Sequence, residues 1–392
     1  MSSNPFLYGK AVTGAAFINR TRETRTLDSA LRRGQSVILF SPRRYGKTSL
    51  IKRVMERLRD HGMLVFYLNL YKVTTLEGFG RYYSETVLSS LHRPADKLFS
   101  LVRTLIPSLK PKLTYSEPHM PSIEIEMGFE TLRRPSSLVE MLNLPERYCE
   151  KKKRRACVVF DEFQELGAFD TDSLLEREMR SAFQHHQLCS YAFLGSKTHL
   201  MQELFKDKNR PFYNFGMHVE LDTIAESEWI SHIDEQFVRT EVPAYSPDYS
   251  RHVLRCSKGH PYYTQMLCSE LWELLVHGPG HSREPVADAL ESILEKENHA
   301  FVELWDSLSS RERRLCAVLS RCGTAQVFSS DFISLHRLPS PSSMQGVVRR
   351  LLRRGVLQRD ALGYSLSDPL FRRWCLRREE DGAAGAQPAV EA

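Results

Sequence analysis

The sequence predicts an α/β fold with a parallel sheet, followed by a helical segment and a small winged helix-turn-helix unit. Two observations carry this prediction. Short apolar runs alternate with segments of helical periodicity up to about Leu221, as in parallel sheets whose strands are joined by crossover helices. Beyond that point the pattern is helical and ends in a small mixed unit. The chain has 392 residues, 42% of them apolar, which is enough for two or three domains.

The predicted strands and helices of the first part follow one another in a regular order. The buried strand SVILF precedes the helical segment KTSLIKRVMERLRD, and a second strand over residues 63–70 precedes another helix. Three further strands are predicted over residues 156–160, in SYAFLGS and in MHVELDTI. Between them, KPKLTYSEPHMPSIEIEMGF predicts a short hairpin inserted in an otherwise irregular stretch.

We therefore expect four regions: a core over residues 1–225 with an insertion at about 94–146, a helical domain over 226–300, a winged helix-turn-helix over 301–378 and a disordered tail over 379–392. No segment approaches the ~20 apolar residues of a membrane span, and the first residues lack a signal-peptide pattern. The eight cysteines are scattered without a C-x-x-C pair. A cytoplasmic protein with reduced, buried thiols and no membrane contact is expected.

The loop SPRRYGKTSL between the first strand and the first helix predicts a phosphate-binding site. It ends in Gly46-Lys47-Thr48, but Ser41 stands where the G-x-x-x-x-G-K-[ST] pattern has its first glycine. A turn from a buried strand into a helix directs N–H groups and the helix dipole at one point, which suits a polyphosphate. Lys47 adds a cation there, and the Thr48 hydroxyl is expected to bind Mg²⁺. The alternative is a chance match on an ordinary strand, turn and helix.

Acidic and polar residues follow two later strands. Asp161 and Glu162 end the apolar run CVVF, at the sheet edge where parallel sheets bind ligands. Asp161 is expected to hold Mg²⁺ and Glu162 to activate the attacking water as a general base; a solvated strand end is the alternative. Ser196 ends the next strand and could hydrogen-bond the γ-phosphate or the water, while a helix N-cap is an equally natural role.

Basic residues are concentrated near the C-terminus. Residues 311–378 contain 14 arginines, no lysine and four acidic residues, so they carry +10 while the rest of the chain sums to −4. Three predicted helices, the first and third opened by serines suited to capping, precede the wing GYSLSDPLF. The third has an apolar face of Val347, Val348, Leu351, Leu352 and Val356. Its other face carries Arg349, Arg350, Arg353 and Arg354. Such a face suits the phosphates of duplex DNA, and a protein contact or a solvated surface is the alternative.

Six segments form an ordered series along the chain: FINRTRE, SPRRYGKTSL, VVFDEFQEL, FLGSKTHLMQELF, RPFYNFG and GHPYYTQMLCSELW. In this series, over roughly residues 10 to 375, the chain resembles the archaeal-type ATPase family, P-loop proteins of the AAA+/STAND group. The resemblance implies a P-loop NTPase core with a parallel sheet, a helical lid, a C-terminal winged helix-turn-helix domain, and ATP with Mg²⁺ as cofactors. The implied phosphate loop consists of Ser41, Pro42, Arg43, Arg44, Tyr45, Gly46, Lys47, Thr48 and Ser49.

The resemblance also implies roles for single residues. The implied catalytic residues are Lys47, Glu162 and Ser196, the last as a sensor, and the implied Mg²⁺ ligands are Thr48 and Asp161. In the lid motif Gly259-His260-Pro261, Pro261 approaches the base or the phosphates, and Arg20 ends the segment that flanks the adenine. Tyr213-Asn214-Phe215 departs from the family, because many relatives have an arginine there; Arg210 is the weak candidate for an arginine finger, and a plain surface arginine is the alternative.

Two classes of function remain open. Glu162 favours an enzyme that uses hydrolysis as a timer or motor, and turnover is slow if a neighbouring chain or partner must supply the arginine. The missing arginine and the basic helix favour a nucleotide-dependent switch that binds DNA or protein with little hydrolysis. ATP or ADP, duplex DNA, and a protein partner or a second copy are the expected partners. Intact Lys47, Thr48, Asp161 and Glu162 argue against a relative that has lost nucleotide altogether.

Overall fold

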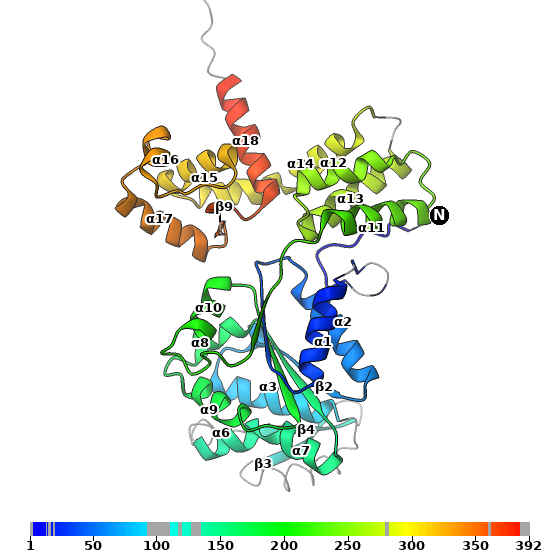
Figure 1. Cartoon of the computed structure of the whole chain (residues 1–392), viewed down its shortest axis with the longest axis vertical. Helices are drawn as coiled ribbons and strands as arrows, with labels where there is room; N and C mark the ends of the chain where they lie inside the picture. Colours follow the sequence, from blue (N-terminus) through cyan, green and yellow to red (C-terminus); the bar gives the residue numbers. More distant parts are fainter. Residues whose placement is uncertain are drawn as a thin grey trace, which may run out of the picture. The chain divides into compact units, whose positions relative to one another are not determined.

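The structure is a computed structural model that describes residues 3–12, 14, 17–18, 20–91, 110–116, 120–126, 135–278, 282–359 and 362–384. The chain divides into two units (Figure 1). Residues 19–222 form one of them, here the α/β unit, and residues 1–18 with 223–392 form the other, here the helical unit. The division after residue 222 lies close to the predicted end of the core at 225, but residues 1–18 pack with the helical unit.

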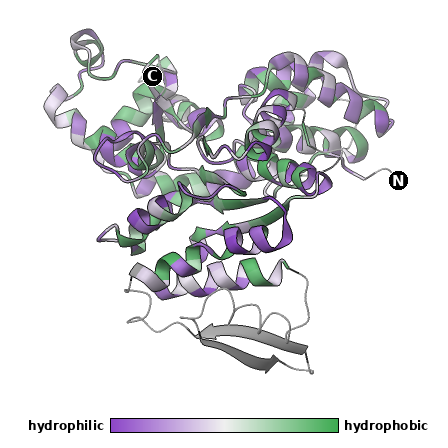
Figure 2. Cartoon of the chain, turned by 60° about the horizontal axis from the view of Figure 1, so that its bottom comes forward, coloured by the Kyte–Doolittle hydropathy of each residue, from purple (hydrophilic) through white to green (hydrophobic). Residues whose placement is uncertain are grey.

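The α/β unit is built on a five-stranded parallel sheet, as predicted. The strand order is β2-β5-β6-β1-β7, and every neighbouring pair is parallel. In that order the strands are Leu64–Asn69, Ala156–Asp161, Cys189–Gly195, Val37–Phe40 and Met217–Glu220. β1, β5 and β6 are buried at every position, which explains why their sequences are largely apolar without alternation. Figure 2 shows the chain coloured by hydropathy, with hydrophobic residues in the strands of the sheet. β6 lies between β1 and β5, and all three strands are parallel. The loops that follow β1, β6 and β5 therefore lie next to one another at the carboxyl edge of the sheet.

Helices cover both faces of this sheet. The helix after β1, α2, spans Lys47–Asp60, the segment predicted from the periodicity of its apolar residues. Phe160 of β5 and Phe193 of β6 stack with ring centroids 5.6 Å apart in the middle of an aromatic core. The other helices of the unit are α1 Thr21–Arg32, η2 Leu70–Lys72, α3 Leu76–Ser89, α6 Pro135–Leu142, α7 Leu144–Lys152, η3 Phe163–Glu165, α8 Leu166–Phe169, α9 Leu174–Phe183 and α10 Thr198–Lys206.

The predicted insertion at about 94–146 contains a hairpin and parts of the core. β3 (Lys110–Ser116) pairs antiparallel with β4 (Met120–Glu126), which confirms the hairpin. The prediction of irregular structure is wrong from Pro135 onward, because α6 and α7 bury Leu138, Met141 and Leu144 in the core of the unit. The parts of the insertion at 94–109, 117–119 and 127–134 lie outside the described residues.

The helical unit contains the predicted lid helices and the winged helix. The lid helices are α11 Glu226–Arg239, α12 Pro247–Ser257, α13 Pro261–His277 and α14 Pro285–Asp306. The winged helix consists of α15 Ser310–Cys322, α16 Ser330–Leu335, α17 Pro341–Arg353, the antiparallel strands β8 Leu357–Arg359 and β9 Tyr364–Leu366, and α18 Pro369–Ala384. α18 continues past residue 379, where a disordered tail was predicted, and Glu379 pairs with Arg321 of α15 at 3.5 Å. Residues 385–392 of the predicted tail lie outside the described part of the chain.

Serine caps open two of the three predicted helices, though not the two expected. Ser309 and Glu312 form a capping box at α15. Ser329 caps α16 by accepting the N–H of Phe332. The third helix, α17, begins with Pro341 after Ser340 and has no side-chain cap, so that part of the prediction is wrong. Proline suits the first position of a helix because it has no N–H to satisfy.

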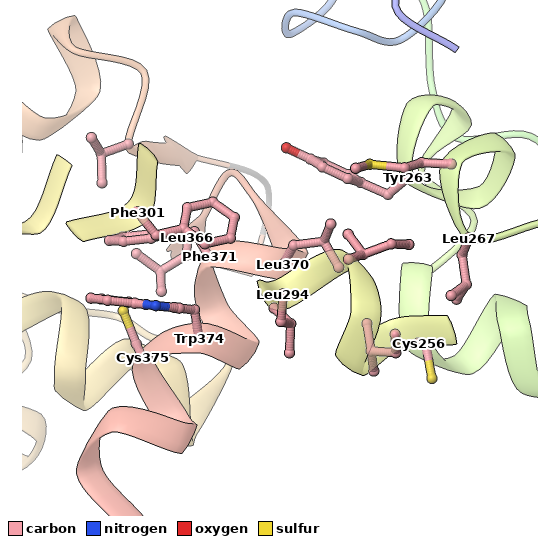
Figure 3. Close-up of a cluster of buried hydrophobic side chains, with 14 of the residues drawn as sticks. Cys256, Tyr263, Leu267, Leu294, Phe301, Leu366, Leu370, Phe371, Trp374 and Cys375 are labelled. Atoms are coloured by element: carbon pink, nitrogen blue, oxygen red, sulfur yellow. The ribbon is translucent and has the colours of Figure 1, made fainter. Parts of the chain in front are cut away.

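One apolar core joins the lid helices to the winged helix within the helical unit (Figure 3). Phe301 of α14 contacts Phe371 of α18 with ring centroids 5.6 Å apart, and Trp374 stacks on Phe371 at 5.8 Å. The Trp374 indole N–H donates to Asn298 Oδ1 at 2.8 Å, and the Tyr263 hydroxyl donates to Asp368. The lid helices and the winged helix therefore form a single packed unit.

Two further predictions concerned the state of the cysteines and the presence of membrane-spanning helices. All eight cysteines are free; seven are buried as predicted, but Cys322 is exposed. In the described ranges, none of the helices combines the length and the apolar character that crossing a membrane requires.

Candidate functional site

The loop between β1 and α2 holds the Lys47 ammonium inside the protein. The Lys47 side chain is 6% exposed, and its Nζ donates to Ser41 O at 2.7 Å, Pro42 O at 2.9 Å and Ser41 Oγ at 3.2 Å. Burial lowers the pKa of Lys47 to about 8, although the nearby carboxylates of Glu162 and Asp161 act in the opposite direction. Ser41, which replaces the first glycine of the pattern, is fully buried. Its hydroxyl is satisfied there because it accepts a hydrogen bond from Lys47 Nζ.

The backbone at the end of this loop adopts left-handed conformations. Arg44 has φ +67° and Gly46 has φ +84°, and Gly46 is the N-cap of α2. A Cβ on Gly46 would meet no heavy atom of the described protein within 4 Å, so its backbone angle alone accounts for glycine here. α2 begins without a side-chain cap, which leaves the first N–H groups of the helix directed toward the loop.

Thr48 and Asp161 meet across the sheet edge even though β6 separates their strands. The Thr48 hydroxyl donates to Asp161 Oδ2 at 3.1 Å, and the Tyr67 hydroxyl donates to the same oxygen at 2.6 Å. Burial raises the pKa of Asp161, which is 3% exposed, and these two hydrogen bonds oppose that rise. A hydroxyl and a carboxylate side by side are hard oxygen donors of the kind that Mg²⁺ prefers, so this pair fits the predicted metal site.

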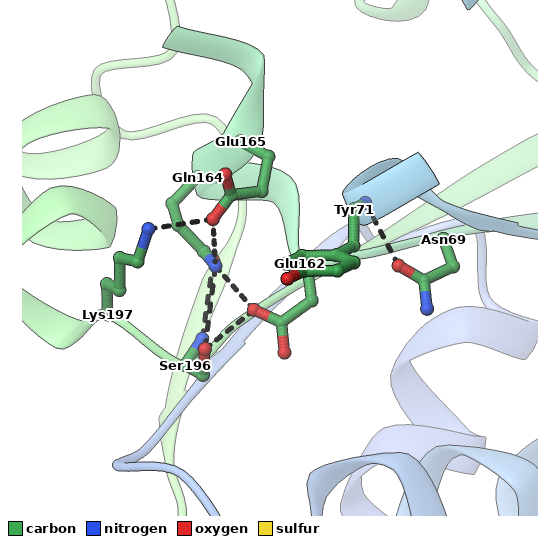
Figure 4. Close-up of polar contacts among 7 residues, drawn as sticks. All are labelled: Asn69, Tyr71, Glu162, Gln164, Glu165, Ser196 and Lys197. Carbon is green, nitrogen blue, oxygen red and sulfur yellow. Dashed lines mark hydrogen bonds and ion pairs between the residues drawn. The ribbon is translucent and has the colours of Figure 1, made fainter. Parts of the chain in front are cut away.

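Glu162 occupies a strained position and contacts Ser196. Its φ is +54°, a left-handed conformation that costs energy for a residue with a Cβ and is concentrated at functional sites. The Ser196 hydroxyl donates to Glu162 Oε2 at 2.6 Å, and the Gln164 amide donates to the same oxygen (Figure 4). Of the two roles weighed for Ser196, the cap is not the one observed, because Lys197 is the N-cap of α10.

Arg20 and Pro261 were predicted to contact the nucleotide from outside the loop. The Arg20 guanidinium is 4% exposed and donates to Asp222 O at 2.7 Å and to Tyr45 O at 3.3 Å. It therefore ties the phosphate loop to the segment that follows β7. Pro261 is the first residue of α13 in the helical unit. The nucleotide contacts of Arg20 and Pro261 stay predictions. Asn19, which belongs to the same predicted adenine-flanking segment as Arg20, lies outside the described residues.

Arg210 pairs with a buried carboxylate of the α/β unit. Its guanidinium lies 3.0 Å from the carboxylate of Glu176 on α9 and donates to Ser173 Oγ at 3.4 Å. The Glu176 side chain is 2% exposed, and its burial raises its pKa to about 7 against the effect of Arg210. Arg210 thus compensates a buried carboxylate and is not a plain surface arginine, while its role as an arginine finger stays a prediction.

Two of the four arginines predicted on the third winged-helix segment have partners within the described structure, and two have none. Arg350 Nε lies 2.8 Å from Oε1 of Glu312, the acid of the α15 capping box. Arg354 donates to the carbonyl of Ser307 at 3.2 Å. Arg349 and Arg353 are exposed and have no ion-pair or hydrogen-bond partner among the described residues. The apolar face of α17 is buried as predicted, except that Leu352 is partly exposed.

One further cluster has donor atoms that could hold a metal, but hydrogen bonds already use them. Atoms of Glu146, His186 and Cys189 lie within 4.8 Å of one another. The Glu146 carboxylate accepts three backbone N–H groups at the start of β6, at 2.7–3.2 Å. The two nitrogens of His186 pair with Tyr191 and Asn143, and burial lowers its pKa to about 4. This cluster holds α7 against the beginning of β6.

The sequence did not indicate a role for Tyr67 or Gln164. It also did not indicate the hydrogen bond from the buried Arg20 guanidinium to the loop backbone. The available signal for Tyr67 was a hydroxyl-bearing residue within the apolar run of the second predicted strand. Gln164 stands in the segment DEFQEL two residues after Glu162, but no pattern distinguished it from a surface polar residue.

Known proteins resemble this chain in sequence pattern and in fold. Residues 17–267 match a family model described as an ATPase domain predominantly from Archaea, and residues 299–377 match a probable winged helix domain. The structure is similar to the Walker-type ATPase PABY2304 of Pyrococcus abyssi, with 15% identity, a TM-score of 0.63, and 92% of this chain and 96% of that chain covered. It is also similar to the ORC2 protein of Aeropyrum pernix in ADPNP-ADP complexes, with 16% identity, a TM-score of 0.50, and coverage of 94% and 96%. No curated protein matches the chain.

Proposed function

The chain belongs to the family of ATPase domains found predominantly in Archaea, and on that premise we propose a slow Mg²⁺-dependent ATPase whose nucleotide state repositions the winged helix. One observation carries the proposal: hydrogen bonds at a single sheet edge connect the polar residues that follow three strands. Thr48, after β1, bonds to Asp161 of β5 at 3.1 Å, and Ser196, after β6, bonds to Glu162 at 2.6 Å. This edge of a parallel sheet is where ligands bind.

In the proposed site, the loop from Ser41 to Ser49 and the first turn of α2 bind the phosphates of ATP. Lys47 supplies the charge, and it is already held in the loop by backbone carbonyls. Thr48 and Asp161 would hold Mg²⁺, which when bound offsets the charge of the phosphates. Their hydroxyl and carboxylate oxygens are brought together by the fold itself.

Glu162 rather than Asp161 is the proposed general base, because only Glu162 has an uncommitted carboxylate oxygen. Both oxygens of Asp161 accept hydrogen bonds, Oδ2 from Thr48 and Tyr67 and Oδ1 from the Glu162 N–H. Glu162 accepts hydrogen bonds at Oε2, and its Oε1 has no partner among the described residues. A base must accept the proton of the attacking water, and Oε1 is the atom that can do so.

Movement of the winged helix with the nucleotide state would follow from the packing of the helical unit. Pro261 and Tyr263 both lie in the first turn of α13, and the Tyr263 hydroxyl donates to Asp368, which caps α18. Since the lid helices share one core with the winged helix, a nucleotide contact at Pro261 would shift both together. Through this coupling, the nucleotide state would regulate the binding of a partner to the winged helix.

A second candidate function is a nucleotide-dependent switch that binds DNA or a protein and hydrolyses little ATP. Two observations favour it. Arg210 is committed to Glu176, so an arginine finger would have to come from a protein partner or a second copy of the chain. Arg349 and Arg353 stand exposed on one face of α17, where phosphates of duplex DNA could reach them. Turnover with and without duplex DNA separates the two candidates.

Removing Arg349 and Arg353 together is expected to weaken binding of duplex DNA about equally for all sequences. Each arginine neutralises one phosphate, so the slope of log affinity against log salt should fall by about 2 in the double Arg→Ala variant. Fluorescence anisotropy at several salt concentrations measures this slope. The matched control replaces Arg22 and Arg25, two exposed arginines of α1, by alanine and loses the same charge. If wild-type protein shows no DNA binding even at low salt, the winged helix contacts a protein instead.

The affinity for ATP is expected to fall as the pH rises above about 8. The pKa of Lys47 is about 8 because of burial, and phosphate favours the charged lysine, so its pKa is higher in the complex. Affinity should be constant at lower pH, where Lys47 is charged in both states, and then fall by up to about tenfold per pH unit. Calorimetric titration from pH 7 to pH 9.5, values chosen to span about this pKa, tests the expectation. An unchanged affinity over that interval would contradict the lowered pKa of Lys47.

A further inference from the structure

The side chain of Gln164 connects the ends of β5 and β6 beside the proposed base (Figure 4). We propose that Gln164 is a positioning residue, which together with Ser196 fixes the Glu162 carboxylate so that Oε1 is presented to the attacking water. The inference rests on the proposed function, because it takes Glu162 as the general base. Gln164 itself contacts no reacting atom.

The amide of Gln164 uses both of its ends in this position. Its Nε2 donates to Glu162 Oε2, and its Oε1 accepts the backbone N–H of Ser196 at 3.3 Å. The Ser196 hydroxyl donates to the same Glu162 oxygen at 2.6 Å and lies 3.5 Å from Gln164 Nε2. The three side chains thus form a closed triangle. Gln164 is 4% exposed, so water has little access to replace these hydrogen bonds.

Gly195 gives an independent indication that the fold reserves space for this amide. A Cβ on Gly195 would lie 2.7 Å from Gln164 Oε1 and 2.3 Å from the side chain of Met201. Contacts this short do not occur, so any larger residue at position 195 would displace the Gln164 side chain, Met201 or both. The last residue of β6 before Ser196 is therefore the one that lets Gln164 reach Glu162.

Fixing Oε2 has a chemical consequence for the other oxygen of Glu162. A glutamate side chain has three torsions and would otherwise sample several orientations. Two donors on Oε2 hold one orientation, and they leave Oε1 without a partner among the described residues. Glu162 also has the strained φ of +54°, a conformation that persists only where surrounding contacts determine it. Misplacement of a catalytic group by about 1 Å can cost about 100-fold in rate.

The test is Gln164→Met, which keeps the length of the side chain and removes both hydrogen bonds. We expect kcat for ATP hydrolysis to fall about 10- to 100-fold, with the affinity for ATP unchanged, because ground-state binding does not use Gln164. Isothermal titration calorimetry measures the affinity, phosphate release measures kcat, and the melting temperature reports folding. Gln184→Met, the same exchange at an exposed position of the same unit, is the matched control and should leave kcat unchanged.

A double variant separates positioning from a structural role. In a Glu162→Gln background, Gln164→Met should cause no further loss of kcat, because its effect passes through Glu162. Parallel losses of ATP affinity, melting temperature and kcat in both backgrounds would make Gln164 a structural residue and overturn the inference. If Gln164→Met keeps the wild-type kcat while Glu162→Gln is inactive, the inference is overturned but the proposed function stands. Wild-type kcat in Glu162→Gln would overturn the base assignment of the proposed function and the inference with it.

Discussion

Lys47→Ala is expected to abolish the rise in melting temperature that ATP with Mg²⁺ produces in the wild-type protein. A ligand that binds only the native state at 100 times its Kd stabilises it by about 2.7 kcal/mol, which for a unit of this size is a shift of about 5–10 °C. Lys47 is the buried cation of the phosphate loop, with Nζ held at 2.7 Å by Ser41 O. Without it, the phosphates lose the charge opposite them, and the shift should disappear.

Lys52→Ala is the matched control for this experiment. Lys52 lies in the same helix, α2, but its side chain is exposed. The control should keep the full ATP-dependent shift. That result would show that the loss of a lysine from α2 is not sufficient to abolish the shift. Thermal melts of the three proteins with and without ATP and Mg²⁺ provide the comparison. Equal shifts in the wild type and in Lys47→Ala would refute the assignment of the loop as the nucleotide site.

Glu162→Gln is expected to bind ATP normally but to hydrolyse it about 10²- to 10⁴-fold more slowly, the usual contribution of a general base. The amide keeps the size of the carboxylate and can still bond to Ser196, yet it cannot accept a proton from water. Glu203→Gln, which makes the same change at an exposed position of α10, should keep the wild-type rate. Phosphate release and calorimetric ATP binding, measured on the same preparations, separate chemistry from affinity.

Asp161→Ala is expected to impair both binding and hydrolysis, in contrast to Glu162→Gln. The change removes the carboxylate that accepts hydrogen bonds from Thr48 and Tyr67 and, in the proposed site, one of the two Mg²⁺ ligands. Should both variants lose ATP binding to the same degree, the division of roles between the two acids would be wrong.

Local patterns in the sequence predicted most of the α/β unit. The periodicity of KTSLIKRVMERLRD predicted the bounds of α2. Largely apolar runs without alternation predicted β1, β5 and β6, because a strand that is covered on both faces has no alternation. The strand order could not be predicted in the same way. The position of β6 between β1 and β5 depends on contacts between distant segments, and it decides which loops meet at the site.

The residues that the sequence did not explain act through tertiary contacts. Helical periodicity placed Arg350 opposite the apolar face of α17, but the packing of α15 brings Glu312 within 2.8 Å of it. The motif DEFQEL indicated Asp161 and Glu162, while the contacts of Gln164 exist only because the ends of β5 and β6 meet. Patterns along the chain indicate residue types and faces; the partners of each side chain are decided by the assembled fold.

Turnover of ATP by the purified full chain, measured as phosphate release with and without duplex DNA, tests the central claim most directly. Glu162→Gln under the same conditions serves as the background. The proposed function predicts slow Mg²⁺-dependent release by the wild type that the variant lacks, with a rate that changes when DNA occupies the winged helix. Release at the same rate by the wild type and by Glu162→Gln, in the presence and in the absence of DNA, would contradict it.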